Sequence, residues 1–369
     1  MGSTWGNHIQ ITLFGESHGP GIGVVLDKLP PGISLDMDLI EKEMYRRSAV
    51  NNPYATPRKE KDVVEILSGV FNGATTGTPL AAIIKNENTR SKDYAQLLVQ
   101  PRPGHADLTG AARYSGFQDH RGGGHFSGRI TAPLVFAGAV AKMYLKSQGF
   151  EHLPVARILA IGGIEDPCEP TVSELENLSF RDERFPVLHS ATEEKMKGAI
   201  LRAAEDEDSL GGVVQVVTAS PPPGLGDPFF DSVESRIAHL VFSVPAVKGL
   251  SFGAGFKLSA MRGSQANDPY RIQNGKIVTE TNHNGGLLGG ISSGMPVVFQ
   301  VAIKPTASIG KAQKTLNLSS KQVETLKIKG RHDPCIVPRV CVVLEAVTAI
   351  AWMECWMEAL KNGCIESAD

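Results

Sequence analysis

The chain has 369 residues, of which 41% are hydrophobic and 21% charged, and both values are ordinary for a soluble globular protein. Its formal net charge of -2 argues against the overall basic field that nucleic-acid binding needs, so local arginines must account for any anion binding. The five cysteines contain no Cys-x-x-Cys pair, which argues against a disulfide framework or a cysteine-rich zinc site and favours free thiols.

The N-terminus lacks the basic and then apolar pattern of a secretory signal. The most apolar long stretch, residues 130–144, is too short to span a membrane, and we expect a buried helix there. We therefore expect a cytoplasmic protein that has neither a membrane nor nucleic acid as a partner.

Taken in chain order, five segments have the composition and end signals of helices. The first follows Ser34 and carries acids early and arginines late, as the helix dipole favours. The second is rich in alanine and closes at Gly149, and the last is long, apolar and ends at Gly363. The predicted helices are residues 35–47, 127–146, 193–205, 231–242 and 339–361.

Seven apolar or β-branched runs predict strands. They are residues 23–26, 63–71, 80–84, 158–161, 213–218, 256–261 and 297–303. Runs of strands separated by a few long helices predict an α+β fold built in layers. No linker, low-complexity segment or long charge run divides the chain, so we expect a single domain over residues 1–369.

Three short segments, far apart in the chain, place a histidine among small or charged residues. Residues 15–20 read Gly-Glu-Ser-His-Gly-Pro, residues 102–107 read Arg-Pro-Gly-His-Ala-Asp, and residues 330–335 read Gly-Arg-His-Asp-Pro-Cys. Glycine and proline fix a close backbone path, histidine titrates near neutral pH, and arginine grips phosphate or carboxylate. These segments predict one site, assembled by folding, that binds an anion and moves protons.

Two glycine-rich segments add to this picture. Residues 121–129 read Arg-Gly-Gly-Gly-His-Phe-Ser-Gly-Arg and open a predicted helix, where free N–H groups attract anions. Residues 282–294 carry paired glycines suited to close approach of a flat or phosphorylated cofactor. The alternative for residues 121–129 is a flexible hinge, and that for residues 282–294 is a glycine-rich turn before a strand. Residues 121–129 fit neither a Walker nor a Rossmann pattern. The His332-Asp333 pair lacks metal-ligand spacing, so we expect no metal site.

Taken together, these segments resemble the chorismate synthase family over residues 5 to 360. Besides the motifs at 15–19, 102–107 and 330–335, the resemblance includes Arg-Gly-Ser-Gln at 262–265, Gly-Gly-Ile-Ser-Ser-Gly at 289–294 and Lys-Pro-Thr at 304–306. Any one motif is weak, but six in the family's order are highly specific.

The resemblance implies an α+β sandwich in which long helices lie between antiparallel or mixed sheets. It implies an anti-1,4-elimination that converts 5-enolpyruvylshikimate 3-phosphate to chorismate and phosphate, the last shared step toward aromatic compounds. The reaction requires reduced FMN without net redox change. The family usually forms homotetramers. The resemblance leaves open whether NADPH reduces the flavin on this chain or a separate flavin reductase supplies it.

The resemblance also implies roles for single residues. His18 resembles the histidine that protonates the departing phosphate, with Ser17 beside it, and His105 resembles the histidine that protonates the reduced flavin. Asp333 resembles the aspartate of a proton relay near the flavin. The expected substrate-binding arginines are Arg47, Arg102 and Arg129, with Arg331 near the flavin phosphate. The other expected flavin contacts are His125, Phe126, Ser127, Pro245, Ala246, Gly289, Lys304, Pro305, Thr306, Ala307 and Ser308.

Three positions depart from the common family pattern. His125-Phe126 stands where many members have Arg-Ser, Pro53 stands where many carry a second basic residue after Arg47, and Ala307 replaces a common serine. Two other functions fit the same glycine-rich anion sites. A flavin-dependent oxidoreductase would consume NADPH in proportion to product, and a phospho-ligand binding protein would not need both His18 and His105.

Overall fold

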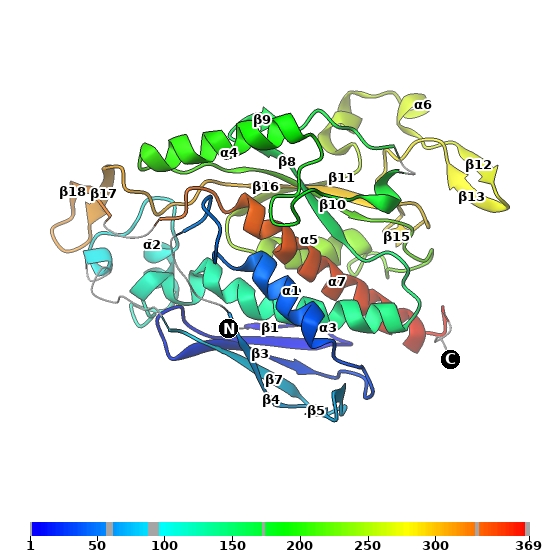
Figure 1. Cartoon of the computed structure of the whole chain (residues 1–369), viewed down its shortest axis with the longest axis horizontal. Coiled ribbons are helices and arrows are strands. Elements are labelled where there is room, and N and C mark those ends of the chain that lie inside the picture. The colour runs from blue at the N-terminus through cyan, green and yellow to red at the C-terminus, as the bar shows by residue number, and fades with distance from the viewer. Residues whose placement is uncertain (1, 57–61, 88–95, 172–173, 329–331, 366–369) are drawn as a thin grey trace.

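The structure is a computed structural model that describes residues 2–56, 62–87, 96–171, 174–328 and 332–365. Two five-stranded sheets enclose a layer of long helices, as Figure 1 shows. This arrangement confirms the expected α+β sandwich. One continuous hydrophobic core includes residues of both sheets and of the helices between them.

The first sheet is antiparallel and has the strand order β1-β2-β3-β7-β4. Its strands are β1 (Thr4–Trp5), β2 (Gln10–Gly15), β3 (Gly21–Asp27), β7 (Leu80–Lys85) and β4 (Val64–Ser68). Leu80, Ala82 and Ile84 of β7 are buried and alternate with less buried residues, because one face of the sheet packs on the helices. The hairpin of β5 (Val70–Phe71) and β6 (Ala74–Thr75) lies at its side.

The second sheet is also antiparallel, in the order β11-β16-β10-β8-β9. Its strands are β11 (Val247–Phe252), β16 (Val297–Ile303), β10 (Gly212–Thr218), β8 (Val155–Ile161) and β9 (Ile164–Glu165). Helix α4 (Ser190–Glu205) covers its outer face (Figure 1), while the inner face packs on the central helices. The central strands are therefore covered on both sides, and β10 reads Gly-Val-Val-Gln-Val-Val-Thr without clear alternation.

The central layer consists of α1 (Met37–Arg47), α3 (Thr131–Ser147), α5 (Val233–Ser243) and α7 (Val337–Lys361). Helix α1 begins where the Asp36 side chain accepts a hydrogen bond from Leu39 N, and it buries Ile40, Met44 and Arg47 at helical spacing. Helices α3 and α7 cross closely at Gly138, where a Cβ atom would lie 2.3 Å from the Cβ of Ala346.

Four charged side chains link these helices inside the core. Arg46 donates to both carboxylate oxygens of Glu345 at 2.6 and 2.8 Å, and Lys142 donates to Glu43 at 2.6 Å and to Glu345 at 3.2 Å. The network has two positive and two negative members, so each buried charge has a partner of opposite sign.

Helix α7 is long and apolar enough to cross a membrane, with a mean hydropathy of 1.7 in its most apolar window. However, 94% of that window is buried inside the fold. The helix is buried along most of its length because strands β8 and β10 of the second sheet and the helices α1, α3 and α5 pack against it.

The short elements lie at the two ends of the sandwich. They are α2 (Asp107–Arg113), η2 (Arg121–Phe126), η3 (Gly128–Ile130), η4 (Glu174–Asn177), η5 (Gly255–Ala260), α6 (Gly263–Ala266), and the hairpins β12 (Tyr270–Gln273) with β13 (Lys276–Thr279), β14 (Leu287–Leu288) with β15 (Ile291–Ser292), and β17 (Gln313–Asn317) with β18 (Gln322–Leu326).

All five predicted long helices are present, and six of the seven predicted strands lie within or overlap observed strands. The predicted strand 256–261 is wrong, because Gly255 has φ +54 and the following residues form the exposed 3-10 helix η5. The predicted strand 63–71 is divided by Gly69, whose φ of +83 ends β4 before β5 begins. Strands β2 and β11 were not predicted.

Candidate active site

The loop that follows β2 packs directly on the glycine turn at residues 122–124. Ser17 N donates to Gly124 O at 3.2 Å, and Ser17 Oγ donates to Gly122 O at 3.1 Å. Ser17 Oγ also lies 3.1 Å from Nδ1 of His18, and both residues are buried. A Cβ atom on Gly122 would lie 2.0 Å from the His18 ring, and its φ is +61. Only glycine therefore fits between the turn and His18.

The second histidine lies against the next residue of the same turn. A Cβ atom on Gly123 would lie 3.0 Å from Cε1 and 3.1 Å from Nε2 of His105. His105 belongs to the loop that leads into α2 and lies 2.7 Å, through Nδ1, from Oδ1 of Asp107. The structure thus brings His18 and His105, 87 positions apart in the sequence, to successive glycines of one turn.

Arg102 holds this second loop in shape. Its backbone N and its Nε donate to Oδ2 of Asp107 at 2.9 and 2.7 Å, and its Nη2 donates to Oδ1 at 2.7 Å. Its Nη1 donates to Ser308 Oγ at 2.8 Å. Burial raises the pKa of Asp107, but hydrogen bonds from Arg102 and His105 outweigh it and hold that pKa well below its usual range. Arg102 is itself buried, so Asp107 supplies its counter-charge.

Residues 304–308 join several of the predicted site segments. The Lys304 side chain donates to Gly104 O, and the Lys304 backbone N donates to Ala246 O at 2.9 Å. Thr306 Oγ1 donates to Asp333 O at 2.7 Å. Partial burial and the charge of Lys248 both lower the pKa of Lys304. The segment therefore links Pro245-Ala246, the His105 loop and Asp333, and it carries a cation whose charge is only partly balanced.

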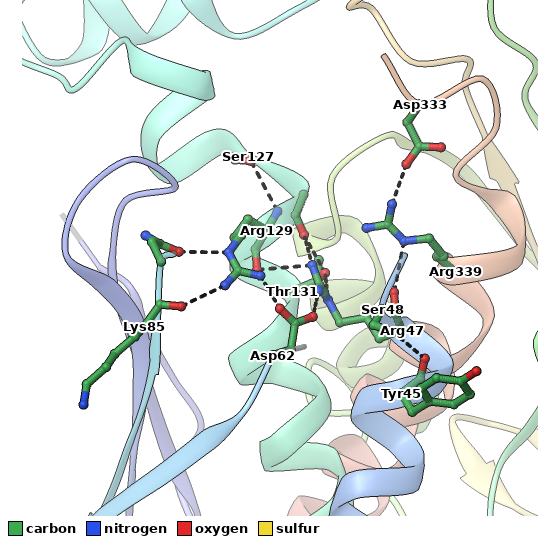
Figure 2. A network of polar contacts seen from close by, with 12 residues as sticks. Tyr45, Arg47, Ser48, Asp62, Lys85, Ser127, Arg129, Thr131, Asp333 and Arg339 are labelled. Carbon is green, nitrogen blue, oxygen red and sulfur yellow. Dashed lines mark hydrogen bonds and ion pairs between the residues drawn. The ribbon is translucent and has the colours of Figure 1, made fainter. Parts of the chain in front are cut away.

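A second cluster is formed by Arg47 and Arg129 around one carboxylate (Figure 2). Arg47 Nη1 donates to Asp62 Oδ2 at 2.5 Å, and Arg129 Nη1 donates to Asp62 Oδ1. Arg47 also donates to Thr131 Oγ1 at 3.1 Å and to Gly128 O at 3.0 Å. Burial, reinforced by the two nearby arginines Arg339 and Arg129 and opposed by Asp62, lowers the pKa of Arg47 to about 10.

This cluster is connected to the His18 loop and, through Arg339, to Asp333. Arg129 Nε donates to Oδ1 of Asn86 at 2.9 Å, and Asn86 Nδ2 donates to Glu16 O and Gly19 O, on either side of His18. On the other side, Arg339 Nε donates to Arg47 O at 3.0 Å, as Figure 2 shows. The arginine cluster is thus linked through Asn86 to the loop that holds His18.

Arg339 and Asp62 are members of the site that sequence reasoning missed. Arg339 Nη1 donates to Oδ2 of Asp333 at 2.5 Å, and Asp62 lies between two of the predicted arginines. Among the described residues of this cluster, three guanidinium groups therefore face two carboxylates. The signal for Arg339 was its place in the first turn of the helix that follows the 330–335 motif. Asp62 lay at the end of a mixed charge run, which gave no signal of its own.

Three of the predicted flavin-contacting residues make contacts with other residues of the chain. His125 Nδ1 lies 3.0 Å from Gly15 O, and its Nε2 lies 3.2 Å from Ser3 Oγ. The Phe126 ring packs on Tyr114, with ring centroids 6.1 Å apart. Ser127 Oγ accepts a hydrogen bond from Arg129 N at 3.3 Å. These three residues fix the glycine turn and the start of α3. Arg331 lies outside the described residues.

Gly289 lies apart from the other predicted flavin contacts. Its loop packs at the start of β16, where Val298 N donates to Gly285 O, and at the start of α5, where Val233 N donates to Gly290 O. Lys304 and Ala246 follow the far ends of β16 and α5. Seven strand residues separate the two places by on the order of 20 Å. Within one chain, the structure does not bring Gly289 to the site of Lys304.

The residues near His105 fit a phosphorylated planar cofactor. Lys304 and Lys248 supply positive charge for a phosphate, and Ser308 supplies a hydroxyl group. The Gly123 turn leaves a cradle that any Cβ atom would fill. Among the described residues, no group of three or more His, Cys, Asp or Glu side chains could hold a metal ion.

Fold and site together define an α+β enzyme that combines buried arginines, which suit anionic ligands, with two histidines at one glycine turn. The family model for chorismate synthase matches residues 9–357. The chain therefore belongs to the chorismate synthase family, whose reaction is that of a lyase.

Individual relatives agree with this assignment. The chorismate synthase of Dehalococcoides mccartyi strain 195 is 46% identical over 365 residues, covering 99% of this chain and 98% of the relative. That of Aeropyrum pernix is 46% identical over 345 residues, covering 94% and 90%. A structure titled "Crystal Structure of Chorismate Synthase" superposes with a TM-score of 0.71 at 29% identity, covering 96% of this chain and 94% of the other.

Proposed function

We propose that this chain converts 5-enolpyruvylshikimate 3-phosphate to chorismate and phosphate at the site around the glycine turn 122–124. The observation that carries the proposal is the convergence of His18 and His105 on successive glycines, with the arginine cluster linked to the His18 loop. The substrate has a phosphate and two carboxylates, so its binding needs several cations, which the chain supplies locally despite its net charge of -2.

His18 acts on the leaving phosphate. A phosphate dianion leaves poorly, so a proton or a cation must stabilise it as the C–O bond breaks. Ser17 Oγ donates to backbone carbonyls of the glycine turn, so its lone pair is available to accept from Nδ1 of His18. Ser17 therefore orients the ring, and His18 holds the proton for the departing group.

Arg47, Arg102 and Arg129 bind the anionic groups of the substrate. Each now has a carboxylate partner, which is Asp62 for Arg47 and Arg129 and Asp107 for Arg102. A substrate anion must share these guanidinium groups or take over the place of Asp62. Asp333 accepts from Arg339 and is hydrogen-bonded to Thr306 through its backbone, so it is placed to move a proton between the two clusters.

Reduced FMN is the cofactor, and it would be held by Pro245, Ala246 and the 304–308 segment with His105 beside it. When bound, reduced FMN would supply transient electron donation to the elimination without net redox change. Lys304 would neutralise its phosphate, and Thr306 and Ser308 would supply hydroxyl groups. His105 holds or moves a proton toward the flavin through its ring nitrogen.

The test is an anaerobic assay of phosphate and chorismate release with chemically reduced FMN. Turnover with catalytic flavin and no consumed reductant is the expected result. The assay is then repeated with oxidised FMN and NADPH, which decides whether the chain reduces its own flavin or needs a separate reductase. Consumption of NADPH in proportion to product in this second assay would contradict the proposal and indicate a flavin-dependent oxidoreductase.

The histidine roles have their own test. His18→Ala and His105→Ala should each lower turnover by about 10²–10⁴-fold, the usual contribution of a general acid or base. His18→Ala should still bind FMN, whereas His105→Ala should change how the absorbance of bound reduced flavin depends on pH. Wild-type turnover in both variants would contradict the roles assigned here.

We also propose that the chain forms homotetramers in the cytoplasm. The β12–β13 hairpin projects from one end of the molecule (Figure 1), and its apolar residues Tyr270, Ile272 and Ile277 are 68–72% exposed. Exposed apolar side chains of this kind mark contact surfaces. The five cysteines are unpaired, which fits a reducing compartment. Light scattering of the purified protein measures the assembly, and a monomer at micromolar concentration would contradict it.

A further inference from the structure

Asp107 contacts His105 in a way that fixes where the ring proton lies. Its side chain is only 7% exposed, and Oδ1 lies 2.7 Å from Nδ1 of His105. Hydrogen bonds from Arg102 and His105 outweigh burial and lower the pKa of Asp107, so the carboxylate is ionised and can only accept. Nδ1 must therefore carry a proton, even when the imidazole is neutral.

The position of the Arg102 guanidinium is consistent with a proton on Nδ1 of His105. Arg102 Nη2 lies 3.0 Å from Nδ1 of His105, but a guanidinium can only donate and a protonated Nδ1 cannot accept. Both groups instead converge on the same oxygen, since Nη2 of Arg102 also lies 2.7 Å from Oδ1 of Asp107. The short distance between the two donors is a consequence of their shared acceptor.

The other ring nitrogen faces the glycine turn. Nε2 of His105 lies beside Gly123, where a Cβ atom would come within 3.1 Å, and the His105 side chain is 18% exposed. Within the described parts of the chain, the hydrogen bonds of the His105 ring all involve Nδ1 and none involves Nε2. It is therefore open to a group that binds over the turn.

We propose that Asp107 is a positioning residue that fixes neutral His105 as the Nδ1–H tautomer and directs an unprotonated Nε2 toward the site over Gly123. The proton exchange of His105 then runs through Nε2. The identity of the group that exchanges this proton rests on the proposed function, whereas the tautomer does not.

The substitution Asp107→Asn should reverse the tautomer. Oδ2 of Asp107 accepts from both N and Nε of Arg102, so the amide oxygen of asparagine would keep that place. The amide NH₂ would then stand where Oδ1 faces His105 and would donate to Nδ1. Nε2 would carry the proton and could no longer accept one. In the serine-protease triad, the corresponding Asp→Asn change lowers kcat by about 10⁴ through the wrong tautomer.

A matched control is Asp119, which lies twelve positions after Asp107 in the sequence. Asp119 accepts from N, Nε and Nη2 of Arg121 at 2.7–3.0 Å, which is the same arrangement that Arg102 makes with Asp107. In the described structure, no histidine ring is hydrogen-bonded to the Asp119 carboxylate. Asp119→Asn therefore removes one equivalent carboxylate without the histidine contact.

The experiment is magic-angle-spinning NMR of the flavin-free protein labelled with ¹⁵N-histidine, at mildly alkaline pH where imidazoles are neutral. The His105 signals are identified by their loss in His105→Gln. We expect a protonated Nδ1 in the wild type and in Asp119→Asn, and a protonated Nε2 in Asp107→Asn. A wild-type ring protonated at Nε2 would overturn the proposal, and this outcome does not depend on whether Asp107→Asn folds.

Turnover with reduced FMN gives the second readout. Asp107→Asn should lose about 10²–10⁴-fold in kcat without a comparable loss of FMN affinity, whereas Asp119→Asn should stay close to wild type. Wild-type turnover in Asp107→Asn would overturn the positioning role. Absence of the elimination in the wild type would overturn the proposed function, and the NMR result for the tautomer would stand independently.

Discussion

At the scale of single residues, the arginines of the site are already paired with carboxylates. Asp62 bridges Arg47 and Arg129, and all three side chains are buried. Among the described residues, these two guanidinium groups surround one carboxylate, so an incoming anion meets two cations at this point. Asp62 thus keeps the arginines in place before substrate arrives, while it competes for the same donors.

Asp62→Asn should lower the thermal stability of the free protein, because two buried guanidinium groups lose their counter-charge, at a cost of about 3–5 kcal/mol. Phosphate ions should restore more of that stability than in the wild type, because an anion now takes the vacated position. The measurement is Tm against phosphate concentration.

The control for this prediction is Asp166→Asn, which removes the carboxylate 3.7 Å from the buried Arg157 in the second sheet, away from the site. It should be destabilising without a gain in response to phosphate. An equal phosphate response in both variants would show that Asp62 does not stand in the place of an anion.

At the scale of elements, the site depends on one turn that only glycine can form. Residues 122–124 all have positive φ, and each is packed against a different partner. The sequence predicted this segment as an anion-binding entry to a helix, and it predicted His18 and His105 as site residues. It could not predict that both histidines meet the same turn, because that contact depends on how three distant loops pack.

Gly122→Ala should disrupt the site more than the fold. Its Cβ atom would overlap the His18 ring at 2.0 Å, in addition to the strain of φ +61. We expect turnover to fall by about 10²-fold or more, since His18 must move from its position. Gly73→Ala is the control, because Gly73 has φ +78 but no atom within 4 Å of its Cβ position. A similar loss of turnover in both would attribute the effect to backbone strain alone.

The buried charge network between the central helices predicts how the stability of the fold depends on pH. Burial by itself raises the pKa of Glu345. The charges of Arg46 and Lys142 lower it by more than burial raises it, so the pKa is about 2. A carboxylate with a depressed pKa stabilises the fold above its unfolded value of about 4.3, and this contribution is lost as the pH falls toward 2. The loss should amount to up to about 3 kcal/mol.

Glu345→Gln should be destabilised at neutral pH, and its unfolding free energy should then fall less than that of the wild type between neutral and acidic pH. Urea unfolding at several pH values measures this difference. Parallel pH curves for the two proteins would mean that Glu345 titrates in the folded state much as it does in the unfolded chain.

At the scale of the whole molecule, the layered fold follows from its most apolar helices. α3 and α7 are buried on nearly all sides, so a sheet must cover each face of the helical layer. Composition and pattern predicted the buried helices and a layered α+β fold, whereas the place of the helices between two sheets was implied only by the family resemblance. The strand order could not be predicted, because β3 pairs with β7 and β10 with β16 across long insertions, and pairing over such distances leaves no local signal.

The same topology separates two segments that the sequence assigned to one flavin site. β16 and α5 each run from the Gly289 loop to the segment of Lys304 and Ala246. A flavin held at Lys304 is therefore out of reach of Gly289 in the same subunit. Contact with Gly289 requires that a neighbouring subunit bring its loop to the site.

Two variants distinguish these contributions. Lys304→Ala should weaken FMN binding about 10- to 100-fold at every protein concentration, since it removes a charge-assisted contact of about 1.5–3 kcal/mol. Gly289→Val should weaken FMN binding only at concentrations where the protein is assembled, because its loop reaches a flavin only across subunits. The measurement is fluorescence titration of FMN at protein concentrations above and below dissociation of the assembly, with light scattering in parallel. An equal effect of Gly289→Val in the dissociated protein would mean that one subunit does bring both segments to the flavin, against the separation that β16 imposes.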